Sequence, residues 1–211
     1  MFIIALSFLL YIQSVLAHPV TFKGGTAISS VHRPKMTHVQ VNYTFHRHAS
    51  IASSYIRLDL DGDNYDIEAP IFHLNTLVKR WNKVGSQGNI YTITGMGYNL
   101  NSKAQDHLFA YTGLQIDYET PRIYTALQGF SFLSDPKEHI PYGARYRFGI
   151  APYIADYDEL QIWVIAQVDH VSDMTDQPRF TPMLRLFYRT VLWEMGQDMQ
   201  GKYWFQMMAH F

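Results

Sequence analysis

The chain contains no cysteine, so disulfide bonds, thiolate metal sites and cysteine nucleophiles are all excluded. An excess of charge of either sign is also lacking, because 17 Lys and Arg residues stand against 18 Asp and Glu residues, for a formal net charge of −1. Such a balance gives no basic footprint for nucleic acid. Aromatic residues make up 15% of the 211 residues, which disfavours intrinsic disorder and fits one β-rich domain.

Long apolar runs are missing after residue 17, where no segment approaches the roughly 20 apolar residues that a spanning helix requires. Before it, Phe2 to Ile12 is almost wholly apolar, and Ser14 to Ala17 supplies the small or apolar residues that a signal peptidase prefers. We therefore predict a signal peptide at residues 1–17, with His18 as the mature N-terminus. No Lys or Arg precedes the apolar run, so an uncleaved anchor is the alternative.

Alternation with a period of two residues recurs along the rest of the chain. In the segment 38–46, for example, Val39, Val41, Tyr43 and Phe45 share one face. Pro70 and Pro182 fall in two of the predicted strands and cannot donate to a sheet ladder, so those strands are expected to be shortened or bulged. About ten strands are predicted, with a range of about eight to twelve: 38–46, 55–60, 65–78, 89–98, 108–118, 122–132, 142–150, 160–168, 180–192 and 202–211.

The last segment ends on an aromatic residue and has an unbroken apolar face made of Tyr203, Phe205, Met207, Ala209 and Phe211. This pattern resembles the closing strand of bacterial outer-membrane β-barrel proteins, in which the terminal Phe and the apolar residues before it are read by the barrel-assembly machinery. The resemblance implies an all-β fold, an antiparallel up-and-down transmembrane β-barrel. It also implies a location in the bacterial outer membrane, with outer-membrane lipid and the assembly machinery as partners.

The predicted organisation is a signal peptide (1–17), a periplasmic N-terminal tail or partial plug (18–36) and a β-barrel (37–211). With ten strands and both termini in the periplasm, the connections near 47–53, 81–88, 119–121, 152–157 and 194–201 would be external. The longer connections 133–141 and 170–179 would then be periplasmic, whereas outer-membrane barrels usually have their long loops outside.

Charges of both signs recur at a spacing of two on the face opposite the apolar one, and this face would line the lumen. An unpaired ion removed from water is costly, so we predict a ladder of paired charges. Phe109, Tyr111, Trp163 and Trp204 share this face and favour a filled interior, although a selective path with an arginine side and an acidic side is the alternative. The predicted ladder comprises Arg57, Asp59, Asp66, Glu68, Asp117, Glu119, Arg145, Arg147, Arg185, Arg189 and Lys202.

Five of the ten histidines fall near the predicted mature N-terminus, at His18, His32, His38, His46 and His48. An N-terminal His offers an amine and an imidazole, and this cluster could bind copper or zinc. Tolerated polar histidines in the lumen and the tail are the simpler interpretation, because no strict zinc motif is present. No cofactor is otherwise expected.

Two weaker motifs suggest other chemistry. The run from Asp59 to Asn64 contains three Asp residues, but its Gly comes too early for an EF-hand loop, so an Asp-Gly hairpin turn is favoured. His48 and Ser50 are the nearest approach to a nucleophilic pair for lipid-ester hydrolysis, without the motifs of known lipid A deacylases or phospholipases. No catalytic residue is therefore assigned.

A soluble periplasmic barrel or sandwich would have the same alternation with its apolar face turned inward. The aromatic residues on the charged face favour the membrane version, because a soluble protein would expose them. We therefore expect an outer-membrane barrel with a structural or narrow transport role. Copper or zinc binding in the envelope is the alternative, and a lipid-ester enzyme is the third.

Overall fold

A computed structural model describes residues 18–60, 66–101, 108–133, 141–172 and 174–211. The predicted signal peptide and the central part of the predicted Asp-Gly turn lie outside these ranges. Twelve strands account for most of the described chain: β1 (Thr26–Arg33), β2 (Met36–His46), β3 (Ala49–Leu58), β4 (Ile67–Lys83), β5 (Ser86–Tyr98), β6 (Leu108–Glu119), β7 (Ile123–Leu133), β8 (Tyr142–Ile150), β9 (Gln161–Val171), β10 (Arg179–Tyr188), β11 (Val191–Gln197) and β12 (Tyr203–His210).

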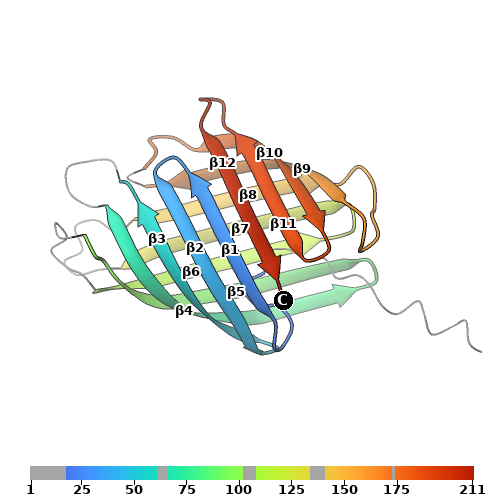
Figure 1. The fold of residues 1–211 in the computed structure, drawn as a ribbon, viewed down its shortest axis with the longest axis horizontal. Coiled ribbons are helices and arrows are strands. Elements are labelled where there is room, and N and C mark those ends of the chain that lie inside the picture. Colours follow the sequence, from blue (N-terminus) through green and yellow to red (C-terminus); the bar gives the residue numbers. More distant parts are fainter. Residues whose placement is uncertain (1–17, 61–65, 102–107, 134–140, 173) are drawn as a thin grey trace, which may run out of the picture.

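Each strand pairs antiparallel with the next, and the sheet closes on itself where β1 pairs with β12 (Figure 1). Ala27 lies opposite His210 and His32 lies opposite Phe205 in this closing pair. Two hydrogen bonds between the backbones of Thr26 and Phe211 extend it to the last residue. The fold is thus the predicted all-β, antiparallel up-and-down barrel, with a strand number at the upper end of the predicted range.

Two strands account for the difference between about ten and twelve. The strand β1 carries Ser29 and Ser30 in its middle, and they interrupt the apolar alternation. For this reason the sequence pattern places these residues in the N-terminal tail. The predicted strand 180–192 is two strands, β10 and β11, joined by a tight turn in which Arg189 has a φ of 53°. The barrel therefore begins at Thr26 rather than at residue 37, and the tail is confined to the residues before it.

The additional strand β1 reverses the predicted positions of the connections as far as the β9–β10 connection, and the division of 180–192 into two strands leaves the connection after β11 on its predicted side. Both described ends of the chain and the short connections β2–β3, β4–β5, β6–β7 and β10–β11 lie at one end of the barrel, which we call the terminal end. The opposite end, which we call the loop end, holds the β1–β2 and β11–β12 turns and the strand ends at Leu58, Tyr98, Leu133 and Val171. The β8–β9 connection, residues 151–160, is the long exception at the terminal end.

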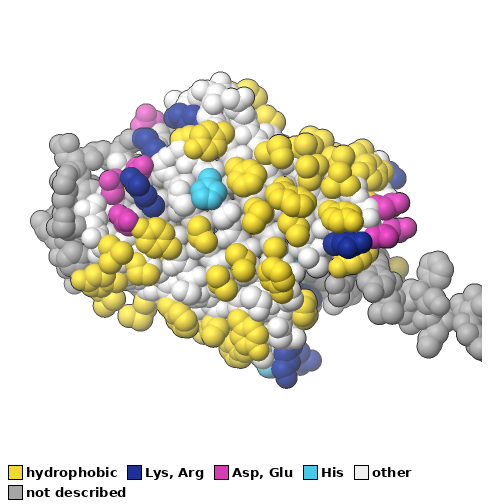
Figure 2. Space-filling model, viewed as in Figure 1, with side chains coloured by type: hydrophobic (Ala, Val, Ile, Leu, Met, Phe, Trp, Pro, Cys, Tyr) yellow, Lys and Arg dark blue, Asp and Glu magenta, His cyan; other side chains and the backbone are white. Residues whose placement is uncertain are grey.

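The outward face of the barrel is apolar, as the alternation predicted. Val39, Val41, Tyr43 and Phe45 of β2 are all exposed, while Asn42 and Thr44 between them are buried in the interior. The same alternation holds on β6, β8, β9 and β12. Figure 2 shows apolar side chains across this surface, with charged groups gathered toward its two ends. Within the described residues, no helix has the length and apolar character needed to cross a membrane.

The two prolines that were expected to shorten strands are accommodated on the outward face. Pro70 lies within β4, which at 17 residues exceeds every other strand in length, and Pro182 lies within β10. A bulge in β4 occurs instead between Leu77 and Lys79, where the register against β5 shifts. The extra residue changes the alternation, so that Arg80 reaches the interior and contacts Asn89 and Tyr91.

The outward apolar face predicts a strong position dependence for charged substitutions. Leu114→Arg, at the middle of β6, is expected to lower the free energy of unfolding in lipid by about 2–4 kcal/mol, because the guanidinium would lie near the bilayer midplane. Ile123→Arg, at the first residue of β7, should cost only about 0–1 kcal/mol, because that position is near the interface. Urea unfolding of both variants in lipid vesicles measures the difference, and equal losses would contradict a membrane-facing exterior.

Candidate functional site in the barrel interior

The N-terminal segment enters the terminal end of the barrel and is held there by wall side chains. The Pro19 carbonyl accepts hydrogen bonds from Ser50 Oγ at 2.6 Å and from Asn42 Nδ2 at 2.9 Å. The Thr21 amide donates to Thr44 Oγ1 at 3.2 Å. Val20 is fully buried against Leu77 and Tyr91. Residues 18–21 therefore form a plug, which is the part of the predicted tail that lies inside the barrel.

His18 is the titratable side chain of this plug, and it is buried. Its Nε2 atom lies 3.6 Å from Asp117 Oδ1, and its ring lies 5.6 Å from that of Tyr91. Burial lowers the pKa of His18 to about 4, and the nearby Asp117 carboxylate only partly opposes this effect. The imidazole is therefore neutral at pH 7.

At the loop end the interior is filled by apolar side chains. Ile56, Leu58, Ile67 and Ile71 from β3 and β4 form a cluster with aromatic residues of β6 and β7. In that cluster Phe109 and Phe132 meet edge to face, with ring centroids 5.5 Å apart. The Phe109 ring also covers Gly97 on β5, where a Cβ atom would lie 2.3 Å from the ring. Apolar packing thus narrows the lumen at this end, as the plug does at the other.

Between the plug and the apolar cluster, one side of the wall carries buried ion pairs. Glu194 accepts from Arg185 Nε at 2.6 Å and from Arg147 Nη1 at 3.0 Å, and all three side chains are buried. Asp169 accepts from Arg33 Nη1 at 2.5 Å and lies 3.6 Å from Arg179 Nη2. Each carboxylate therefore serves two guanidinium groups.

Strand register explains why these particular groups meet. Arg185 lies directly opposite Glu194 in the β10–β11 pair, and Arg147 lies opposite Gln167 in the β8–β9 pair. Inward side chains on paired positions are about 4.5–5.5 Å apart at Cβ, within reach of a direct hydrogen bond. Gln167 accepts from Arg147 Nε at 2.8 Å and donates to Asp169 at 2.9 Å, which connects the two groups of ions.

A ladder of amides continues around the wall from the ion pairs toward the plug. Arg145 donates to Gln128 at 3.3 Å, Gln128 donates to Gln115 at 2.7 Å, and Gln115 donates to Asp117 at 2.8 Å. Arg145 with Gln128 and Gln128 with Gln115 are register partners on β8, β7 and β6. Asn89 donates to the second oxygen of Asp117 at 2.6 Å. The ladder thus joins the arginine-rich side of the lumen to the carboxylate beside His18.

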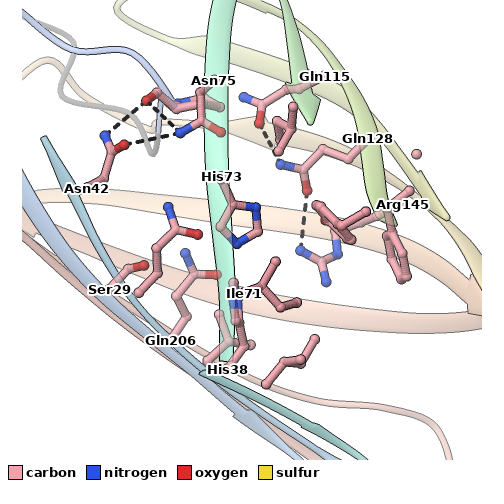
Figure 3. Close-up of a pocket in the computed structure, with 18 of the residues that line it drawn as sticks. Ser29, His38, Asn42, Ile71, His73, Asn75, Gln115, Gln128, Arg145 and Gln206 are labelled. Carbon is pink, nitrogen blue, oxygen red and sulfur yellow. Dashed lines mark hydrogen bonds between the residues drawn. The ribbon is translucent and has the colours of Figure 1, made fainter. Parts of the chain in front are cut away.

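A cavity of about 200 Å³ lies within this polar interior (Figure 3). Its lining reaches from His18 and Pro19 of the plug to Leu58 and Phe132 of the apolar cluster. In the close-up, polar side chains from many strands surround it, and those labelled are Ser29, His38, Asn42, His73, Asn75, Gln115, Gln128, Arg145 and Gln206. We take this cavity and its lining as the candidate functional site.

Of the predicted charge ladder, the structure places five members inside the barrel: Asp117, Glu119, Arg145, Arg147 and Arg185. The other six are corrections to that prediction, because they lie on the outside or in connections: Arg57, Asp59, Asp66, Glu68, Arg189 and Lys202. On β3 and β4 the inward positions belong to Ile56, Leu58 and Ile67, so that Arg57 and Glu68 point outward. Arg57 there pairs with Asp59 at 3.1 Å on the exposed surface.

The five histidines predicted as metal ligands lie in separate places. His18 and His38 line the cavity, and His32 is on the outward side of β1. His46 and His48 are exposed beside the β2–β3 turn, with ring centroids 5.8 Å apart. In the part of the chain that the structure describes, no three His, Cys, Asp or Glu side chains are arranged to hold a metal ion.

The predicted nucleophilic pair of His48 and Ser50 is not formed. Ser50 is buried and donates to the Pro19 carbonyl, whereas His48 is exposed at the turn. A different pair, Ser54 Oγ and His73 Nε2, lies 2.6 Å apart inside the barrel. A serine hydroxyl on a histidine is half of a nucleophilic arrangement, but among the described residues no group orients His73 through Nδ1.

Sequence reasoning missed several functional groups of the interior: Arg33, Ser54, His73, Asp169, Arg179 and Glu194. Asp169 and Arg179 lie on the inward positions of β9 and β10, just beyond or before the predicted strand ends. Extending the alternation by a few residues would have found them. Placing Glu194 and Arg33 in the interior depends on knowing the boundaries of β11 and β1. The contact between Ser54 and His73 depends on the register of β3 against β4.

Loss of the shared carboxylate should be costly. Glu194→Gln keeps the shape of the side chain but leaves Arg147 and Arg185 buried without a counter-ion, so the free energy of unfolding is expected to fall by about 3–5 kcal/mol. Urea unfolding in detergent micelles measures the change. Asp59→Asn, which removes the exposed ion pair with Arg57, is the control and should leave the midpoint unchanged.

The buried His18 predicts a pH dependence of stability. The unfolded chain takes up a proton at His18 near pH 6.5, whereas the folded protein does so only near pH 4, so this contribution to stability is complete above pH 6.5 and is lost as the pH falls toward 4. Unfolding midpoints measured from pH 7 to pH 4.5 should therefore fall more steeply in the native protein than in His18→Gln. Parallel curves would show that His18 is not docked in its neutral form.

No protein family model matches the sequence, and no curated protein matches it. Among solved structures, the KdgM porin is similar with a TM-score of 0.50 and 9% identity, over 89% of this chain and 98% of that one. A chain described under "Unveiling the Mechanism Behind the in-meso Crystallization of Membrane Proteins" has a TM-score of 0.49 and 9% identity, over 90% of this chain and 83% of that chain. LpxR from Salmonella typhimurium has a TM-score of 0.41 and 9% identity, over 89% of this chain and 99% of its own. At this identity the KdgM likeness concerns the fold alone, and it agrees with the closed antiparallel barrel of this chain.

Proposed function

We propose that this protein is an integral β-barrel of a bacterial outer membrane that provides a narrow path for small solutes and is closed at rest. The closed barrel, the apolar exterior and the C-terminal strand ending on Phe211 support the location. The apolar residues 2–12 support export through a signal peptide. With both termini in the periplasm, the loop end would face outward, which matches the usual asymmetry of these barrels.

The observation that carries the transport role is a cavity with both polar and apolar groups in its lining, which lies between two closures of different kinds. The loop-end closure is built from side chains of the wall itself, including Ile71 and Phe132. The terminal-end closure is a separate segment, residues 18–21, that the wall holds through a few hydrogen bonds to Pro19 and Thr21. A segment held in this way can leave without breaking the strand ladder. A barrel with only a structural role would need neither the cavity nor a removable plug.

Planar-bilayer conductance tests this proposal. The protein that begins at His18 should be closed most of the time, because the plug and the apolar cluster narrow the lumen. Removal of residues 18–21 should raise the mean conductance several-fold. Thr44→Val, which removes the acceptor of the Thr21 amide, should raise the fraction of time open without shortening the chain.

Lys23→Ser is the matched control, because Lys23 is exposed just beyond the plug and its removal should change nothing. Folding of every variant is checked by its heat-dependent mobility on a denaturing gel. A large, steady conductance in the native protein would contradict a closed resting state. Folded plug variants that never conduct would leave the barrel with a structural role only.

A further inference from the structure

Guanidinium groups outnumber carboxylates on the ion-paired side of the lumen. Asp169 and Glu194 are the carboxylates there, and each is bonded to two arginines. The arginines on this side of the described interior are Arg33, Arg145, Arg147, Arg179 and Arg185. Four of the five therefore share two carboxylates, and Arg145 is left over. This side of the lumen carries an excess of positive charge.

Arg145 lacks an ion pair although a carboxylate lies opposite it in the sheet. Asp169 is its register partner in the β8–β9 pair. Asp169 instead accepts from Arg33 at 2.5 Å and from Gln167 at 2.9 Å, and lies 3.6 Å from Arg179. Among the described residues, no carboxylate lies within ion-pair distance of Arg145. Its hydrogen-bond partner is a neutral amide of the wall, and the Asp169 and Glu194 carboxylates attract its charge from beyond ion-pair distance.

The neutral contacts of Arg145 leave donors unused. Its guanidinium donates from Nη1 to Gln128 and lies over the Trp204 ring, 4.4 Å from the centroid. Its Nε atom is buried and has no hydrogen-bond partner, and the indole nitrogen of Trp204 also has none. An unpaired donor that is shielded from water is costly, and a counter-ion near the guanidinium would lower that cost.

Arg145 also lines the cavity, so a counter-ion has a place to bind. The cavity is roomy enough for several water molecules, since one occupies about 30 Å³ in the liquid. His73, His38 and Gln206 line the same space and offer polar atoms for hydroxyl groups (Figure 3). His73 is fixed through Nε2 by Ser54 at 2.6 Å, and its Nδ1 has no partner.

We infer that the cavity binds a small oxyanion, a hydroxylated carboxylate or a phosphate, with Arg145 as its cationic anchor. The planar guanidinium fork matches the two oxygens of a carboxylate or phosphate, and the neutral amides and imidazoles around it match hydroxyl groups. This inference rests on the proposed function and names the class of solute that would pass through the barrel.

Isothermal titration of the detergent-folded protein tests the site with three ligands of similar size. D-glycerate carries a carboxylate and two hydroxyls, glycerol carries hydroxyls without charge, and inorganic phosphate is the second oxyanion. We expect glycerate or phosphate to bind and glycerol not to bind. Arg145→Gln should weaken the binding of the oxyanion by about tenfold or more, which corresponds to about 1.4 kcal/mol or more.

Arg57→Gln is the matched control, because it removes the same group from the outer surface and should leave binding unchanged. If Arg145→Gln does not fold, Arg145→Lys keeps the charge without the fork and should bind several-fold more weakly than the native protein. Equal affinity in the native protein and the Arg145 variant, or no heat of binding for either oxyanion, would overturn the site. Conductance is measured separately: conductance without oxyanion binding would refute only this site, and binding without conductance would refute only the transport role.

Discussion

Closure of β1 on β12 is the constraint from which the other features of the molecule follow. An open sheet edge leaves a row of backbone donors and acceptors unpaired, and in lipid each of these groups is expensive. Closing the sheet removes both edges and divides every strand into an outward and an inward set of side chains. Once the register is set, the inward neighbours of each residue are determined as well. Arg145 thus acquires Gln128 on one side and Asp169 on the other.

The interior that results from this closure is a compromise between filling space and pairing charge. Aromatic and aliphatic side chains fill the loop end, while ions and amides on the remaining wall satisfy one another through register partners. An ion can be buried only where its partners are well placed. Glu194 and Asp169 each lie beside two arginines, so two carboxylates serve four buried guanidinium groups. The arrangement leaves one arginine beside the cavity without a carboxylate.

The two closures of the cavity differ in the contacts that hold them in place. Most of the apolar cluster belongs to β3, β4, β6 and β7, with Val171 at the end of β9 and Met174 in the connection that follows it. Opening this closure would therefore require side chains of several strands to rearrange. The plug belongs to no strand and is bonded mainly through the Pro19 carbonyl and the Thr21 amide. Movement of the plug would break those hydrogen bonds and expose Val20. The backbone hydrogen bonds between the strands of the barrel would stay intact. In the proposed transport role, the plug is the element of the terminal end that would act as a gate.

The class of fold and the outward face could be predicted from the amino-acid pattern, because alternation is a local property of each strand. On β2, β6, β8, β9 and β12 the predicted apolar positions are the exposed ones. The strand number, the outward direction of Arg57 and Glu68, and the partners of each buried ion became clear from the three-dimensional fold. A strand interrupted by Ser29 and Ser30 becomes recognisable through its pairing, not its composition. The site at Arg145 depends on register between strands, and register is a relation between distant segments that no single segment encodes.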